Sequence, residues 1–379
     1  MRRRRFYFLE PSKVGSQHIT FIEAYLSALT SSELLRESFD LVFCASASTA
    51  AELSRSVVGK LDVRRIHVMN PEKRRLTLKT CVEWFVVTGF LWKLRRGDIL
   101  FVSCVLPTTL LLLELTNKVL RRRGLFVTLH GEIEGAFDKA LQRPRSFGFW
   151  VLQWIGLRRP GSFLRVTVID DFIKSRLIDV FPDRFLDADI VTVHNQLLPF
   201  QLVDLSRPNM GVCFIGYRTV IKGFQHFADL STRFPDIEFL AIGGGKTENV
   251  RNGQSKPLLD GASYLREIAG CAVAFFPYIS GYSCSLSAAA IDALSVGVHI
   301  VAFDRPCFVH LRESLGDDAV TICATTDEAA TLIGNLAWRE AKFLGRQRRL
   351  ERLAASKYGS KSVVADFERL ISKHDEINR

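Results

Sequence analysis

The chain has 379 residues, a net charge of +11, 47% hydrophobic residues and 24% charged residues. This length exceeds what one ordinary hydrophobic core organises and predicts two domains. The apolar content excludes a disordered chain, and no apolar run reaches the roughly 18–20 residues of a membrane-spanning helix.

Short apolar runs alternate along the chain with longer segments of helical periodicity. Runs that are apolar on both faces are typical of parallel strands covered by helices. In the first half they predict strands at residues 6–9, 41–45, 65–69, 99–104, 125–130, 166–169 and 190–193. In the second half they predict strands at residues 212–215, 239–242, 272–276, 300–303 and 319–323. The predicted fold class is therefore α/β with two parallel sheets.

Helical periodicity is clearest in the second half. Residues 224–234 place apolar side chains on one helical face, and residues 326–343 follow the capping pattern Thr325-x-x-Glu328. A segment at 196–209 contains two prolines and no clear period, which indicates a linker. The predicted domains are residues 1–197 and 198–355, followed by a C-terminal helix at 356–379.

The positive charge lies in the first half of the chain. Residues 1–165 contain 27 Lys and Arg against 14 Asp and Glu, whereas the other 214 residues contain 24 against 26. The excess indicates either a solvated basic surface or a domain that meets an anionic partner, such as a phospholipid surface or a pyrophosphate lipid. Nucleic acid is not expected as a partner, because no recognisable binding motif for it is present.

The eight cysteines form no C-x-x-C pair and lie mostly in apolar runs. This is typical of reduced, buried thiols in a cytoplasmic protein. The eight histidines are scattered without ligand spacing near a cysteine, so neither a metal nor another cofactor is expected. No signal peptide is evident, since the arginines at 2–5 precede only a short apolar run.

Residues 214–224 place two cations beyond a predicted strand. The strand ends at Gly216, and a short loop then carries Arg218 and Lys222 before a helix begins near Gly223. Cations at the mouth of a parallel sheet suit a diphosphate, because charge-assisted contacts are strong. Taken alone, the two side chains carry little information, because Arg and Lys on a loop are usually solvated.

Residues 275–301 predict a strand that ends at Pro277, then a Ser/Gly loop with Tyr278 as a donor-site candidate, and then a helix. Ser285 or Ser287 would cap this helix, and its free N–H groups beside the two cations would complete a pyrophosphate site. Asp292 lies on the helix, where its carboxylate either accepts hydrogen bonds from ribose hydroxyls or is a plain surface charge.

Together these two segments resemble the donor domain of GT-B glycosyltransferases, above all the retaining bacterial enzymes of exopolysaccharide assembly. Residues 216–223 are similar to the family pattern G-x-x-R-x-x-K-G, whose Arg and Lys contact the donor diphosphate. Residues 292–301 resemble the second half of the Glu-x7-Glu motif, with Asp for Glu, and the first Glu of that motif is Cys284 here. Gly244 belongs to a stretch similar to another strand end of the donor domain.

Two segments of the first domain resemble GT-B enzymes more weakly. Gly15, Ser16 and His18 match the loop after the first strand, on the acceptor side. His130 matches a strand-end histidine that reaches towards the transferred sugar, although a hydrogen-bonded structural role is equally open. Glu132 follows as a candidate catalytic base.

The resemblance implies two Rossmann-like domains whose parallel sheets face a central cleft, with the last helix crossing back to the first domain. It implies metal-independent transfer of a sugar from a nucleotide-sugar donor to a glycan, on a lipid carrier, in polysaccharide synthesis. Retention, the outcome in the nearer family, makes a protein base unnecessary, whereas inversion would need Glu132, Glu134 or Asp170. The alternatives are a sugar-nucleotide epimerase of the same architecture, or an inactive nucleotide-sugar-binding protein, which Cys284 permits.

One helix of the first domain predicts contact with the inner face of an anionic membrane. Residues 146–159 carry two tryptophans and flanking arginines, the composition of an interfacial helix. The outward side chains at helical spacing would be Phe147, Trp150, Trp154 and Leu157. A helix buried in the domain core is the other interpretation.

Overall fold

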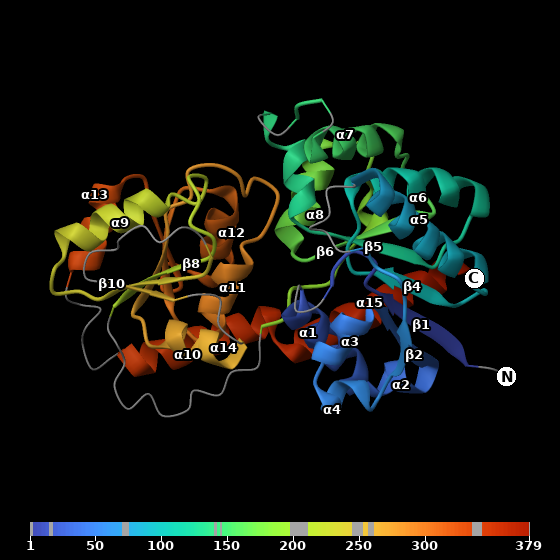
Figure 1. The fold of residues 1–379 in the computed structure, drawn as a ribbon, viewed down its shortest axis with the longest axis horizontal. Helices are drawn as coiled ribbons and strands as arrows, with labels where there is room; N and C mark the ends of the chain where they lie inside the picture. Colours follow the sequence, from blue (N-terminus) through green and yellow to red (C-terminus); the bar gives the residue numbers. More distant parts are fainter. Residues whose placement is uncertain are drawn as a thin grey trace. The chain divides into compact units, whose positions relative to one another are not determined.

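The computed structural model describes residues 3–14, 18–69, 76–139, 142–144, 146–197, 211–244, 253–256, 261–335 and 343–378. The chain divides into two compact units: unit 1 is Met1–Gln196 with Ser360–Arg379, and unit 2 is Leu197–Gly359. Each unit has its own parallel sheet (Figure 1). The α/β class with two parallel sheets that the sequence predicts is confirmed.

The described part of unit 1 forms a seven-stranded sheet in the order β3-β2-β1-β4-β5-β6-β7, and each neighbouring pair is parallel. Its strands are β1 (Arg4–Leu9), β2 (Phe39–Ala45), β3 (Asp62–Arg65), β4 (Ile99–Val102), β5 (Leu125–Leu129), β6 (Leu164–Val168) and β7 (Ile190–Thr192). Its helices are α1 (Ile19–Ser31), α2 (Glu33–Ser38), α3 (Ala47–Glu52), α4 (Arg55–Val58), α5 (Leu76–Lys93), α6 (Pro107–Leu120), η1 (Gly131–Ala136), α7 (Phe147–Leu157), α8 (Asp171–Val180), η3 (Asp187–Asp189) and α15 (Ser360–Asn378).

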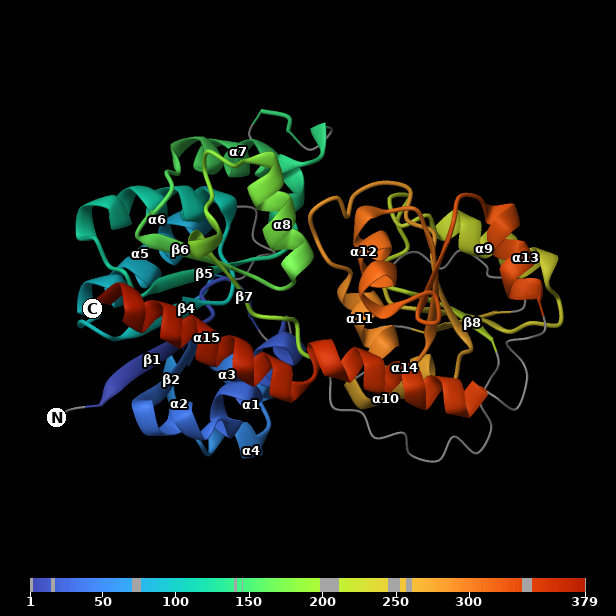
Figure 2. The same ribbon diagram turned by 180° about the vertical axis from the view of Figure 1, so that it is seen from behind.

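Alternating side chains of β1 show how helices cover the sheet of unit 1. Phe6 points to one face, where its ring lies 6.1 Å from that of Phe367 on α15. Tyr7 points to the other face, where its ring lies 5.5 Å from that of Phe90 on α5. Helices α1 and α15 therefore cover one face, and α5, α6 and α7 lie on the other (Figure 1, Figure 2).

The described part of unit 2 forms a six-stranded parallel sheet in the order β10-β9-β8-β11-β12-β13. Its strands are β8 (Val212–Ile215), β9 (Phe239–Ile242), β10 (Gly253–Lys256), β11 (Val273–Phe276), β12 (His299–Phe303) and β13 (Val320–Cys323). Its helices are α9 (Phe224–Arg233), α10 (Gly261–Ala269), α11 (Ala288–Ser295), α12 (Pro306–Leu315), α13 (Thr326–Gly334) and α14 (Phe343–Tyr358). Phenylalanines from β8, α9, β9 and β11 fill the core on one face of this sheet.

Three elements differ from the sequence prediction. The strand expected at residues 65–69 is wrong, because β3 occupies Asp62–Arg65 and pairs with β2 although three of its four residues are charged. The edge strand β10 was not predicted. The helix expected at residues 326–343 is wrong in length, since α13 ends at Gly334, although Thr325 caps it as predicted by accepting a hydrogen bond from the Glu328 N–H at 3.2 Å.

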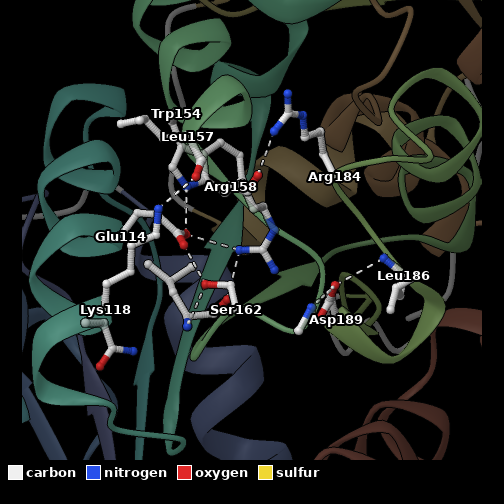
Figure 3. Close-up of polar contacts among 12 residues, drawn as sticks. Glu114, Lys118, Trp154, Leu157, Arg158, Ser162, Arg184, Leu186 and Asp189 are labelled. Atoms are coloured by element: carbon white, nitrogen blue, oxygen red, sulfur yellow. Dashed lines mark hydrogen bonds and ion pairs between the residues drawn. The ribbon is translucent and has the colours of Figure 1, made fainter.

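The prediction that α7 contacts a membrane is wrong for Trp154 of its apolar side and for the flanking Arg158. Trp154 is fully buried, and its Nε1–H donates to Glu114 Oε2 at 3.3 Å. The fully buried Arg158 donates to the same oxygen at 3.3 Å (Figure 3). The acidic Glu114 on α6 therefore draws both side chains inward, because buried charge requires a partner. Phe147 and Leu157 do face outward, at 49% and 40% exposure. In the described part of the chain, no helix has the length and apolar character needed to cross a bilayer.

Candidate functional site

The sheet of unit 2 reverses its strand order between β8 and β11. β8 pairs with β9 on one side and with β11 on the other, so the loops after β8 and β11 leave the sheet at a topological switch point. Open parallel sheets bind ligands at the carboxyl ends of the strands at such a point. The two segments that the sequence singles out are the loops after these two strands.

Two glycines allow the β8 loop to fold tightly. Gly216 has φ of 121° and Gly223 has φ of 63°, a region that disfavours other residues. A Cβ at Gly216 would lie 2.6 Å from Lys222 Nζ, and one at Gly223 would lie 1.8 Å from the Pro277 carbonyl oxygen. Gly216 therefore leaves room for the Lys222 side chain within the loop, and Gly223 brings the loop against the end of β11.

Lys222 projects its ammonium group towards the β11 loop. Nζ lies 5.3 Å from the ring centroid of Tyr278, a cation–π contact. Burial lowers the pKa of Lys222, and no carboxylate among the described residues forms an ion pair with it. A partly buried cation without a carboxylate is poised to receive an anion.

Arg218 is anchored in the same loop. Its backbone N–H donates to the carbonyl oxygen of Gly244 at 3.0 Å, which ties the loop to the end of β9. Its guanidinium lies 5.4 Å from the ring centroid of Phe224, and burial lowers the pKa of Arg218. The loop cations and Gly244 thus occupy the ends of neighbouring strands, as the sequence analysis expects.

The β11 loop leads into the N-terminus of α11. Tyr278 is fully buried, and its hydroxyl lies 3.3 Å from Ser287 Oγ. Ser287 caps α11, because its Oγ accepts a hydrogen bond from the Ala290 N–H at 3.4 Å. Ser285 is also buried in this loop, whereas Ser287 alone acts as the N-cap of α11. The first turn of α11 offers backbone donors that suit an anion.

Asp292 lies on α11 and is held by a tyrosine of the neighbouring helix. Tyr264 of α10 donates its hydroxyl hydrogen to Asp292 Oδ2 at 2.9 Å. Burial raises the pKa of Asp292 to about 6, although this hydrogen bond opposes the shift. The carboxylate therefore changes charge near pH 6, and its hydrogen bond to Tyr264 distinguishes it from a solvated surface charge.

In unit 1 the strand order reverses between β1 and β4, where a buried cluster joins the strand ends. Glu10 accepts two backbone N–H groups of the following loop at 3.0 and 2.9 Å and the Ser103 hydroxyl at 2.6 Å. His130, at the end of β5, places Nε2 2.7 Å from the Ser103 carbonyl oxygen. Its backbone N–H donates to Glu132 Oε1 at 2.9 Å, so two predicted catalytic residues are neighbours.

His18 lies beside this cluster at the start of α1. Its ring is 5.4 Å from that of His130, and burial together with that neighbour lowers the pKa of His18 to about 3. Glu10, His18 and Cys104 form a group within the described residues whose potential ligand atoms lie within 4.8 Å of one another. Because Glu10 already accepts several hydrogen bonds, the group is explained without a metal ion. Gly15 and Ser16, predicted for the same loop, lie outside the described residues.

Known structures resemble the chain along almost its whole length. HepE of Anabaena in complex with UDP aligns with a TM-score of 0.65 at 12% identity, covering 97% of this chain and 99% of that one. Sucrose-phosphate synthase of Thermosynechococcus elongatus aligns with a TM-score of 0.67 at 13% identity, covering 98% and 99%. A glycosyltransferase of Rickettsia africae aligns with a TM-score of 0.63 at 9% identity, covering 98% and 99%. The chain has the GT-B fold. No model of a protein family matches it, and the search of curated proteins finds no match.

Within the GT-B fold, the described residues that the sequence predicts for donor binding gather at one site of unit 2. Gly216, Arg218, Gly244 and Lys222 lie on the β8 and β9 ends, and the residues from Tyr278 to Asp292 follow β11. His18, His130 and Glu132 gather separately in unit 1. The other two candidate bases are buried. Glu134 lies in η1, and Asp170 caps α8 by accepting a hydrogen bond from the Phe172 N–H at 2.8 Å.

Several residues of these sites are not evident from the sequence. Tyr264 lies in an amphipathic helix without a motif, so only the structure shows its bond to Asp292. Tyr282 has φ of 61°, and its ring lies against that of Tyr278 at 4.6 Å between centroids, tilted by 32°. Glu10 directly follows β1, and its position after a predicted strand was the one available signal.

Proposed function

We propose that the protein is a glycosyltransferase whose unit 2 binds a nucleotide-sugar donor. The observation that carries this proposal is Lys222, a partly buried cation without a carboxylate partner in the described chain, at the switch point of the unit 2 sheet. HepE of Anabaena, which shares the fold, has been crystallised with UDP and with UDP-glucose. A donor diphosphate would supply the anion that Lys222 lacks.

The proposed chemistry needs stabilisation of the leaving nucleoside diphosphate. Arg218, Lys222 and the N–H groups of the first α11 turn would share its developing negative charge, and Asp292 would accept hydrogen bonds from the ribose hydroxyls. Two protein cations offer the charge that a bound metal supplies in other glycosyltransferases, so we propose metal-independent transfer. Tyr264 would position the Asp292 carboxylate.

We propose that unit 1 binds the acceptor, a glycan on a lipid carrier in polysaccharide synthesis. His130 would contact the reacting sugar, and Glu10 supports its position through Ser103. The basic excess of residues 1–165 favours association with the anionic inner face of a membrane. We further propose retention, for which no protein base is required and which the likeness of residues 216–223 and 292–301 favours.

An inactive nucleotide-sugar-binding protein is the second candidate. Cys284 stands where the retaining family has its first motif Glu, and its side chain is fully buried. A buried thiol cannot replace a carboxylate contact with the donor sugar. Donor binding without turnover would therefore favour this candidate.

Thermal unfolding with UDP, GDP and dTDP tests the donor site, because a ligand that binds the native state raises the melting temperature. One nucleotide should stabilise the protein, and Arg218→Ala should abolish most of that shift. Arg233→Ala is the matched control, because Arg233 is an exposed arginine of unit 2 that lies at the end of α9 and pairs with Asp327. This variant should keep the full shift. If none of the three nucleotides stabilises the protein, the donor assignment fails.

Turnover is measured separately as nucleotide released from the matching nucleotide sugar with a lipid-linked glycan. Release should depend on the acceptor and persist in EDTA. Release without acceptor would instead indicate the epimerase reaction if the free sugar is the epimer of the donor sugar, whereas an unchanged sugar would indicate hydrolysis of the donor. Stabilisation by the donor without any release under these conditions would identify an inactive binding protein.

A further inference from the structure

Helix α5 of unit 1 exposes an apolar side to solvent. Leu78, Phe85 and Trp92 are spaced seven residues apart, two helical turns, and therefore lie along one side. Their exposed fractions are 45%, 65% and 70%. The two charged side chains in the first part of the helix, Lys79 and Glu83, are buried and lie 3.7 Å apart. A soluble helix normally exposes its polar side, so this apolar side requires a partner.

The neighbouring helices extend this apolar surface. Trp84 Nε1–H donates to Thr116 Oγ1 at 2.9 Å, which joins α5 to α6. Leu115 and Val119 of α6 are 43% and 80% exposed. Lys118 of α6 donates to the Leu157 carbonyl oxygen of α7 at 2.8 Å, and Figure 1 shows the three helices side by side. The exposed apolar side chains of the three helices form one surface, which we call the apolar helical face: Leu78, Phe85, Trp92, Leu115, Val119, Phe147 and Leu157.

The acidic residues of this region are turned inward. Glu83, Asp98 and Glu114 are the three carboxylates between residues 76 and 130, and they are 1%, 6% and 0% exposed. Each accepts hydrogen bonds within unit 1. Glu83 and Glu114 therefore present no negative charge at the surface, and Asp98, which lines the hollow described next, uses its carboxylate to accept the backbone N–H groups of Arg5 and Arg95.

Apart from the buried Lys79, the basic residues of the same region lie at the C-terminal ends of α5 and α6. The exposed ones are Lys93, Arg95, Arg96, Lys118, Arg121 and Arg123. Five arginines, including Arg122, line a hollow of about 280 Å³ together with His374. Burial, together with the charges of Arg165 and Arg4, lowers the pKa of His374 to about 4, so it adds no charge at neutral pH. The hollow holds space and donors for phosphate groups.

We propose that the apolar helical face and its arginine hollow dock unit 1 on an anionic phospholipid bilayer. Phe85, Trp92 and Val119 would enter the interface between headgroups and acyl chains, and the arginines would bind lipid phosphates. Charge complementarity selects this occupant, because a second copy of the chain would bring an equally basic rim against this one. The docking surface specifies the membrane association proposed above and is independent of the donor site.

Sedimentation with vesicles tests the surface in the full chain. The protein should bind vesicles of phosphatidylcholine with phosphatidylglycerol at low salt, leave them at high salt, and ignore phosphatidylcholine alone. Phe85→Ser with Trp92→Ser, and separately Arg95→Glu with Arg96→Glu, should each weaken binding by about tenfold or more. Leu34→Ser and Arg36→Glu on α2 are matched controls from the other face of the sheet and should bind normally.

A second readout separates contact from insertion. Brominated lipids should quench tryptophan fluorescence in the wild type, and Trp92→Phe should bind vesicles while losing most of that quenching. All variants should keep the melting-temperature shift caused by the donor nucleotide, which distinguishes this proposal from the donor-site proposal. Absence of binding to anionic vesicles at low salt would overturn it. So would a dimer that Trp92→Ser dissociates, which would assign the face to a second copy.

Discussion

Replacing Lys222 by Met should weaken donor binding and stabilise the free protein. The ammonium lies 5.3 Å from the Tyr278 ring without a described carboxylate partner, and burial lowers its pKa. Methionine keeps the aliphatic contact with the ring and removes the partly desolvated charge, so the melting temperature without ligand should rise. The lost cation–π contact opposes this gain by about 0.5–1 kcal/mol.

The loss on the donor side follows from one missing charge-assisted contact. Such a contact contributes about 1.5–3 kcal/mol, which corresponds to a roughly 10- to 150-fold higher Kd for the nucleotide. Calorimetric titration gives the Kd, and thermal unfolding without ligand gives the stability. Lys174→Met is the control, because Lys174 pairs with Asp187 at 2.6 Å. This variant should leave the nucleotide affinity unchanged and should not raise the melting temperature. A Kd within threefold of wild type, or a melting temperature that falls below that of the control, would refute the reasoning.

Two further predictions concern pH. If Asp292 binds ribose as a carboxylate, affinity for the nucleotide sugar should be full above its pKa of about 6 and fall as pH drops through that value, whereas Asp292→Asn should bind weakly and without this pH dependence. Calorimetric Kd values from pH 5 to 8 decide, and a wild-type affinity that is flat across this range would contradict the role. Burial lowers the pKa of His194, but its hydrogen bonds with Asp171 and Asp366 outweigh burial and raise the pKa to about 9. The charged His194 should therefore stabilise the protein fully below its unfolded pKa of about 6.5 and lose up to about 3 kcal/mol as pH rises through 9. Urea unfolding at pH 7 and pH 10 should show this difference in the wild type and not in His194→Asn; equal losses in both would assign it to other groups.

The sequence predicts best where a strand is buried on both faces. The strands at Val212–Ile215 and Phe239–Ile242 coincide with the predicted ranges, because their continuous apolar runs end at polar or glycine residues. The position of β3 is not predicted in this way, because an edge strand with the sequence Asp-Val-Arg-Arg is held by backbone pairing with β2 and is not buried on both faces. Its charged residues have no apolar pattern to detect.

In the candidate site, too, the sequence predicts local features and misses contacts between distant residues. The Gly216 and Ser287 positions were predictable, because a strand end and a helix cap are local features. The hydrogen bond from Tyr264 to Asp292 joins residues 28 positions apart and leaves no local pattern. The inward turn of Trp154 was equally hidden, since helical spacing alone does not reveal that Glu114 lies on the neighbouring helix.

Helix α15 affects the order in which the chain can fold during synthesis. Phe367 of this helix packs against Phe6 of β1, so the core of unit 1 contains residues from both ends of the chain. All of unit 2 leaves the ribosome before that helix does. Unit 2 can therefore complete its core first, while the sheet face of unit 1 that α1 and α15 share is covered by α1 alone. A nascent chain stalled before Ser360 would expose Phe6, Phe101 and their neighbours to chaperones and proteases.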